Sequence, residues 1–198
     1  MATRVLRLMA CTLPLFLLIF AASCAQVEKR VDLTYGRFVN ASGGAGQVFV
    51  AQPIEQYSVA ALPAGKQVIG KAENADVVTK DNPATWLLSA LAQELSAAGY
   101  EVKTVPNLPA DASKGVKAAI LALSANQSSK VLTITTVTEV KLEIQLWKNG
   151  QLINTLTAGA RDQEEGLDRS AEPIRWALEK TLQRAMQELV PDIIKSLK

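Results

Sequence analysis

The sequence of 198 residues contains no histidine and only two cysteines, Cys11 and Cys24. Histidine is the usual general base near neutral pH, so its absence excludes Ser-His-Asp and Cys-His mechanisms. Zinc sites built from histidine and cysteine are excluded as well. If Cys11 is removed with a signal peptide and Cys24 carries lipid, no disulfide can form within the mature chain, and packing alone must stabilise the fold.

The chain also has no large excess of positive or negative charge. The chain has 21 Lys and Arg residues against 19 Asp and Glu residues. Removal of an N-terminal signal would take away Arg4 and Arg7 and leave 19 residues of each sign, so the mature chain is formally neutral. The longest basic run is Lys29-Arg30. Because nucleic-acid binding requires a cationic field, we expect no nucleic-acid partner.

The N-terminus has the pattern of a secretory signal. Two arginines precede an uncharged apolar run from Leu8 to Ala22, which are the n-region and h-region of such a signal. The run of 15 residues contains Pro14 and is shorter than the roughly 20 residues that a helix needs to cross a bilayer core. A lasting transmembrane span is therefore not expected.

The stretch FAASCAQ, residues 20–26, resembles the lipobox of bacterial lipoproteins, in which a peptidase cuts before a cysteine that carries lipid. The resemblance implies removal of residues 1–23 and a Cys24 that carries S-diacylglycerol and N-palmitoyl groups. Ala21 stands where the lipobox prefers leucine. The stretch 8–11 matches the local pattern too, but no h-region precedes it. Two or more acyl chains hold a protein stably on a membrane.

The residue after the cysteine bears on localisation. In enterobacterial lipoproteins an aspartate at this position retains the protein in the inner membrane, and here the sorting position is Ala25. The resemblance therefore implies an outer-membrane protein that faces the periplasm. An ordinary secretory signal cut near Ala25, with Cys24 discarded, is the alternative.

The mature chain has about 175 residues, which is enough for one domain with a full core. We expect an acylated N-terminus and flexible tether over residues 24–46 and a periplasmic domain over residues 47–198. The glycine-rich stretch SGGAG, residues 42–46, lacks the spacing of the phosphate-binding motifs. We interpret it as part of the tether.

Two helices are predicted. The first helix is predicted to begin at Asn82-Pro83 and to end at Gly99. Its solvent face carries Glu94. Its apolar face comprises Leu87, Leu88, Leu91, Leu95 and Ala98, and Trp86 is expected at the edge of the core. The second helix follows a loop over residues 161–170, with Asp168 or Ser170 as cap and Pro173 in its first turn. Its core face comprises Ile174, Leu178, Leu182, Ala185 and Leu189. Pro191 should break or kink it, and the tail beyond packs on the domain or touches a partner.

About five strands are predicted. They cover residues 47–51, 100–105, 116–123, 132–146 and 151–160. The fourth is unusually long, so we expect a bulge or bend in its threonine-rich part, whereas Ser128-Ser129 and Asn149-Gly150 are interpreted as turns. The weakly patterned connection 52–82 can hold a minor hairpin around Gly65. The fold class is therefore α+β, with two helices on one face of a mainly antiparallel sheet whose other face is polar.

Two groups of charged residues invite a catalytic or metal-binding interpretation. Glu139, Lys141 and Glu143 share one strand face, and alternating charges on an open sheet face are ordinarily solvated surface. Acidic residues gather in the loop 161–170, but not at the spacing of a calcium-binding loop. We therefore expect no catalytic residues, no metal and no cofactor.

The stretch WLLSALAQELSAAGYEV, residues 86–102, resembles the YajG-like bacterial lipoproteins, in which a helix of this length runs into a Gly-Tyr pair and a strand. The following AAILAL, the hairpin TEVKLEIQLWKNGQ and the capped C-terminal helix are similar to that family too, so the likeness spans about residues 84–190 and the lipobox. It implies a small α+β domain on an outer-membrane lipid anchor, with no assigned reaction.

These observations predict a non-enzymatic outer-membrane lipoprotein that binds other components of the cell envelope. Its expected partners are the membrane, through the anchor, and an envelope protein or further copies of the same chain. An accessory subunit of a transport or polysaccharide-export complex is one alternative. A periplasmic ligand-binding protein, with the segment 52–82 as a lid, is another.

Overall fold

The computed structural model describes residues 28–52, 63–69, 72–130 and 132–198. The described residues form eight strands and two helices. The strands are β1 (Lys29–Val31), β2 (Gln47–Ala51), β3 (Pro63–Ile69), β4 (Ala72–Thr79), β5 (Glu101–Val105), β6 (Lys114–Ser129), β7 (Ile134–Lys148) and β8 (Gln151–Gly166). The helices are α2 (Pro83–Ala97) and α3 (Glu172–Leu197). No helix in these ranges is both long enough and apolar enough to cross a membrane.

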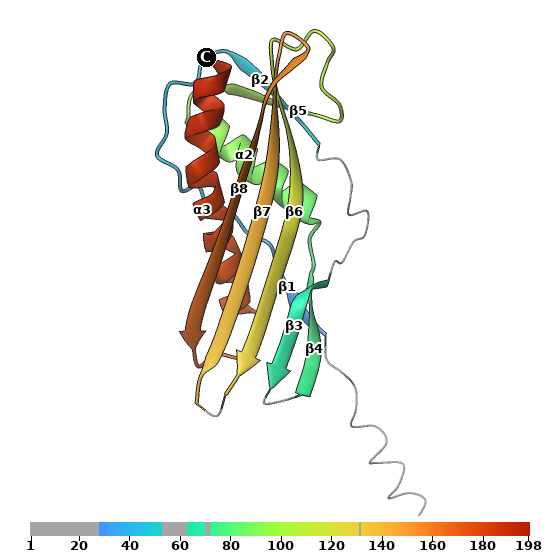
Figure 1. Ribbon diagram of the computed structural model, residues 1–198, viewed down its shortest axis with the longest axis vertical. Coiled ribbons are helices and arrows are strands. Elements are labelled where there is room, and N and C mark those ends of the chain that lie inside the picture. Colours follow the sequence, from blue (N-terminus) through green and yellow to red (C-terminus); the bar gives the residue numbers. More distant parts are fainter. Residues whose placement is uncertain (1–27, 53–62, 70–71, 131) are drawn as a thin grey trace, which may run out of the picture.

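All eight strands belong to one sheet, and both helices lie on the same face of it (Figure 1). The long strands β6, β7 and β8 form an antiparallel meander. The other edge of β6 pairs in parallel with β2 near its beginning and with β3 near its end. β5 extends the sheet beyond β2, and β4 and β1 extend it beyond β3. The predicted α+β class and mainly antiparallel sheet are confirmed, with eight described strands in place of about five.

The meander follows from the alternation in β7. Seven alternate positions from Ile134 to Leu146 are buried, and Glu139 and Lys141 between them are exposed. Asn149 and Gly150 have φ of 51° and 74°, as the predicted two-residue hairpin turn requires. The predicted bend in the threonine-rich part is wrong. The pairing of β7 with both neighbouring strands runs without a register shift from Ile134 to Lys141. Thr138 in this part faces inward, and its hydroxyl lies 2.6 Å from that of Thr181 on α3.

Helix α2 begins and ends where the sequence predicts. The Asn82 side chain accepts a hydrogen bond of 2.8 Å from the Ala84 N–H, and Pro83 occupies the first helical position. Gly99 follows the helix with φ of 108°, which side chains rarely adopt. Trp86 is buried, and its indole N–H donates to the Thr34 carbonyl at 2.7 Å.

Helix α3 differs from the prediction at both ends. It passes through Pro191 without a break up to Leu197, because apolar side chains after the proline remain buried on the sheet. The tail therefore packs on the domain. At the other end the cap position is Ala171, although the Ser170 hydroxyl does accept from the Glu172 N–H at 3.2 Å.

Two predicted connections are also wrong, and a third is confirmed with its turn at another position. Ser128-Ser129 continue β6, and the turn is closed by the Lys130 N–H donating to the Thr133 carbonyl at 2.8 Å. Residues 161–166 extend β8 and are no loop, because they pair with the threonine-rich start of β7. A hairpin does form between β3 and β4, but Gly65 lies at a register shift within β3 and not at the turn.

The largest departure concerns residues 28–46, predicted as part of a flexible tether. Residues 29–31 form β1, and residues 32–46, called the strap below, run along both helices to β2. Val31 and Val39 are buried in the core, and part of Tyr35 packs against it. The predicted tether is therefore wrong for this range, because its alternate apolar residues are covered by the helices. Residues 24–27, with Cys24 and Ala25, lie outside the described residues.

Candidate functional site

A buried carboxylate on α2 holds the strap. Glu94 is 1% exposed and accepts a hydrogen bond from the Tyr35 hydroxyl and another, of 2.8 Å, from the Phe38 N–H. The Val39 N–H lies 3.2 and 3.3 Å from its two oxygens. Burial, reinforced by Glu94, raises the pKa of Tyr35 above its usual value. Glu94 was predicted on the solvent face of α2, and that prediction is wrong because the strap covers this face.

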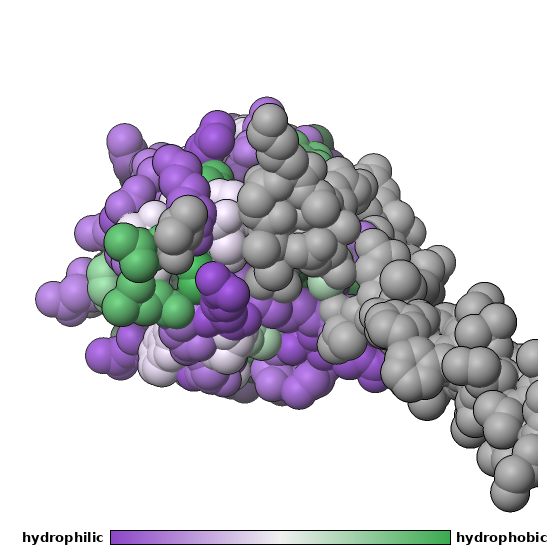
Figure 2. All heavy atoms as spheres, turned by 90° about the horizontal axis from the view of Figure 1, so that it is seen from below, coloured by the Kyte–Doolittle hydropathy of each residue, from purple (hydrophilic) through white to green (hydrophobic). Residues whose placement is uncertain are grey.

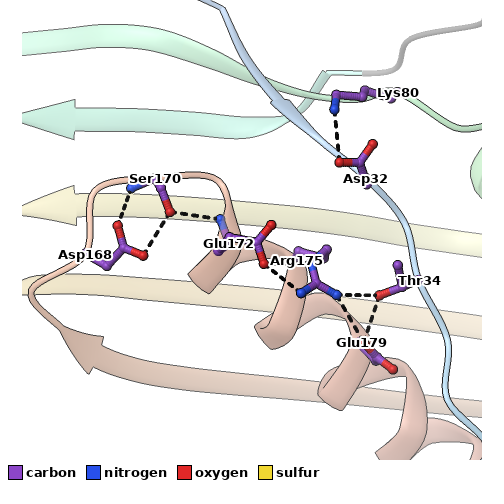
Figure 3. Close-up of polar contacts among 8 residues, drawn as sticks. All are labelled: Asp32, Thr34, Lys80, Asp168, Ser170, Glu172, Arg175 and Glu179. Carbon is purple, nitrogen blue, oxygen red and sulfur yellow. Dashed lines mark hydrogen bonds and ion pairs between the residues drawn. The ribbon is translucent and has the colours of Figure 1, made fainter.

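A second carboxylate, on α3, holds the strap from the other helix (Figure 3). Glu179 accepts hydrogen bonds from the Thr34 hydroxyl at 2.8 Å and from the Gly36 N–H at 2.7 Å. Gln183 donates to the Gly36 carbonyl at 2.8 Å. Arg175 donates to the Thr34 hydroxyl at 3.1 Å and forms an ion pair of 2.6 Å with Glu172. The strap is thus bound by side chains from both helices.

The strap and α2 border a cleft of about 300 Å³. Its lining includes Tyr35, Asn82, Thr85, Trp86, Ser89 and Gln93. Leu33 and Asp81 complete the lining, so polar groups lie among apolar surface. The indole N–H of Trp86 is already bonded to the strap. The volume is at the lower limit of small-molecule sites. Such a cleft suits a small polar molecule held by hydrogen bonds.

A different kind of surface lies along β8. Among the described strands β8 pairs only with β7, so its other edge carries backbone groups without a strand partner. Residues 151–160 of this edge contain no charged residue and no proline. Leu152 and Ile153 are 49% and 44% exposed, next to a register shift in the β7–β8 ladder. This part of β8 could accept an added strand.

Two acidic side chains of β8, Asp162 and Glu164, face α3 and pair with its basic residues. Asp162 lies 3.2 Å from Lys180 and 3.1 Å from Arg184, and Glu164 lies 2.6 Å from Lys180. These carboxylates raise the pKa of Lys180. Within the described ranges no group of acidic residues is arranged to hold a metal ion. Two of the acids predicted to form a solvated loop thus join a strand to a helix, and Glu165 and Asp168 are exposed.

The glycine-rich stretch 42–46 has a packing role. The Gly44 N–H donates to the Ala98 carbonyl at 2.9 Å, and a Cβ on Gly44 would lie 2.5 Å from the Tyr100 ring. Its carbonyl oxygen would lie 2.8 Å from a Cβ on Gly99. The glycines therefore let the strap pass close to the end of α2.

The structure brings some of the predicted charged residues together and not others. Glu139, Lys141 and Glu143 lie along the sheet face opposite the helices, where Glu139 and Lys141 are exposed. Glu94, Glu179 and the residues of the strap were not predicted as a site. The apolar alternation of Val31, Leu33 and Tyr35 is the sequence signal that would have indicated a packed segment.

The model of a family described as uncharacterised lipoprotein matches residues 65–193, more than half of the chain. No curated protein matches the sequence.

Among solved structures, a Xanthomonas campestris protein of the family DUF330 is 10% identical, with a TM-score of 0.59 over 85% of this chain and 95% of that one. A neuraminyllactose-binding hemagglutinin homolog from Helicobacter pylori is 14% identical, with a TM-score of 0.40 over 85% and 92% of the two chains. A lipoprotein from Caulobacter crescentus is 11% identical, with a TM-score of 0.37 over 68% and 91%. The first of these shows a shared fold. The match over residues 65–193, which agrees with the resemblance to the YajG-like proteins, shows that the chain belongs to the family of uncharacterised lipoproteins.

Proposed function

We propose that this lipoprotein is anchored in the outer membrane through acylated Cys24, faces the periplasm, and binds an extended segment of another envelope protein without catalysing a reaction. Family membership supports a lipid anchor, and the lipobox supports Cys24 as its site. Ala25 at the sorting position supports the outer membrane. The observation that carries the binding role is the unpaired edge of β8.

This edge has the properties of a strand acceptor. Its first ten residues are uncharged, so no like charges oppose an incoming strand and no lysine blocks one. Backbone hydrogen bonds would provide affinity, and the exposed Leu152 and Ile153 would contact alternate side chains of the added strand. Proteins of one transport or polysaccharide-export complex are the kind of partner that could supply such a segment.

A second copy of the chain fits this edge poorly. A symmetric dimer built on β8 would pair the two strands antiparallel. β8 has 16 residues and spans about 50 Å. The chain enters β1 near the C-terminal end of β8, because Lys29 donates to Gln127 at 2.7 Å and to the Ser170 carbonyl at 3.3 Å. Antiparallel pairing would therefore place the two lipid anchors at opposite ends of the dimer, and one membrane could not hold both.

Photo-crosslinking in intact cells tests the binding role. A photoreactive amino acid in place of Thr155, on the free edge, should yield a crosslinked product that contains a second envelope protein. The same amino acid in place of Lys141, on the open sheet face, is the control and should yield none. Ile153→Lys should abolish the Thr155 product, whereas Gln163→Lys, farther along the strand, should not. No product at Thr155, or a product made only of this chain, would refute the proposal.

The anchor is tested separately by mass spectrometry of the protein from membranes. Acylated Cys24 should be the first residue, and the Cys24→Ala variant should lack lipid and leave the membrane fraction. Fractionation of the two membranes should place the wild-type chain in the outer one. A mature chain that begins elsewhere would refute this part.

The cleft beside the strap favours a second function, the binding of a small polar ligand. A thermal-shift screen of the full chain against glycans and lipids tests it, with Ser89→Trp as the variant that fills the cleft. A ligand that stabilises the wild type and leaves Ser89→Trp unchanged would support ligand binding. The absence of any shift would count against it.

A further inference from the structure

We infer that the end of the domain nearest the anchor docks on the membrane surface through two exposed leucines, Leu132 and Leu167. The inference rests on the proposed acylation of Cys24 and goes beyond it, because a lipid anchor alone leaves the orientation of the domain open. This end is formed by the β6–β7 turn and the β8–α3 loop at the bottom of Figure 1. β1 lies farther up the sheet, and its Lys29 side chain reaches down to Gln127 and to the Ser170 carbonyl.

The two leucines emerge side by side from neighbouring strands. Ile134 at the start of β7 pairs with Gly166 at the end of β8, so the residues just beyond them leave the sheet at the same end. Leu132 is 79% exposed and Leu167 is 81% exposed, the highest values among the large hydrophobic residues that the structure describes. Figure 2, which views this end of the molecule, shows hydrophobic surface gathered on one side with hydrophilic surface around it.

The length of chain before β1 brings this end close to the lipid. Five Cα steps separate Cys24 from Lys29, and a fully extended chain covers about 17 Å in that distance. Lys29 is fixed at this end by its hydrogen bonds to Gln127 and to the Ser170 carbonyl. Because the strap is bound to both helices, no longer tether is available while the fold is intact. The leucines are therefore held near the headgroup layer.

The composition of this end suits a bilayer surface. Lys130 and Arg169 are exposed here, and long basic side chains place their charge among headgroups while their stems contact apolar groups. Glu165 and Asp168 are exposed here too, so the contact is mainly apolar and should depend little on anionic lipid. Two leucines bind a membrane weakly on their own, but the anchor supplies the high effective concentration that makes a weak contact persist.

Fluorescence in reconstituted vesicles tests the inference. The full acylated chain has no free thiol after processing, so a cysteine in place of Leu132 or Leu167 can be labelled alone with an environment-sensitive fluorophore. Gln151→Cys, at the opposite end of β8, is the matched control. In vesicles of phosphatidylethanolamine and phosphatidylglycerol, brominated lipid should quench the label at both leucine positions and not at Gln151.

A second set of variants guards against an effect of the label itself. With the fluorophore on Lys130→Cys, the double change of Leu132 and Leu167 to serine should abolish quenching, and Leu152→Ser should not. Vesicle flotation separates the two proposals. A chain that floats with equal quenching at all positions overturns the docking alone, whereas a chain that fails to float overturns the anchor and the docking together.

Discussion

Among the helix side chains that hold the strap, Glu94 on α2 accepts the most hydrogen bonds from it. Replacing Glu94 with alanine should therefore loosen the strap more than replacing any other of these side chains. The Tyr35 hydroxyl and the backbone N–H groups of Phe38 and Val39 would lose their acceptor. A hydrogen bond to a charged group contributes about 1.5–3 kcal/mol, and a buried donor left without a partner costs about 1–3 kcal/mol. Removal of the carboxylate also ends the cost of keeping a charge buried, which offsets part of the loss.

We therefore expect Glu94→Ala to lower the free energy of unfolding by about 2–4 kcal/mol, against a total of about 5–15 kcal/mol for a typical domain. Glu94→Gln, which keeps one acceptor oxygen, should lower it by about 1–2 kcal/mol. Urea unfolding followed by circular dichroism measures both. The control is Glu188→Ala, which removes an exposed carboxylate from α3 and should leave the free energy within about 0.5 kcal/mol of the wild type.

Limited proteolysis reports on the strap directly. Arg37 is exposed in the middle of the strap, and trypsin cleavage after it requires the backbone to leave the helices. Glu94→Ala should speed this cleavage under conditions in which the rest of the domain stays folded, and Glu188→Ala should not. If Glu94→Ala matches the wild type in both unfolding free energy and cleavage rate, the view that Glu94 holds the strap is wrong.

Three further changes test other parts of the fold. Glu179→Ala removes the acceptor of two strap donors and should lower the free energy of unfolding in urea by about 1–2 kcal/mol; no change would contradict its role. Because burial raises the pKa of Tyr35, its hydroxyl ionises in the unfolded chain before the folded one, so its contribution to stability is complete below pH 10 and is lost above it. The stability advantage of the wild type over Tyr35→Phe should therefore shrink above pH 10, and a constant difference would refute this. Gly99→Ala, at φ of 108° and with a Cβ 2.8 Å from the Gly44 carbonyl oxygen, should lower stability by about 1–3 kcal/mol, and an unchanged Tm would contradict it.

Local signals in the sequence predicted the parts of the fold that local chemistry determines. Asn82-Pro83 and Gly99 marked the ends of α2, and Asn149-Gly150 marked the hairpin. In each case one or two residues are enough to predict the feature, because a helix cap or a turn with positive φ involves only residues that are a few positions apart in the chain.

Features that depend on distant segments were missed. Glu94 belongs to the polar face of α2 by its spacing, and only the arrival of the strap, more than fifty positions earlier in the chain, makes that face buried. Pro191 is a helix breaker by local rules, but burial of Ile193, Ile194 and Leu197 outweighs its cost. The β8 edge and the strap were missed for the same reason, since strand order cannot be read from the pattern of any single strand.

With Cys24 acylated as we propose, the strap lies between the anchor and the rest of the domain, and the length of chain that joins them depends on whether the strap is bound. With the strap bound, the chain between Cys24 and β1 can span at most about 17 Å. β1 pairs with β4 over three residues only, so a pull on the lipid would act first on that short parallel ladder and then on the Glu179 and Glu94 contacts in turn. Release of residues 29–46 would add about 60 Å of extended chain between Cys24 and the rest of the domain.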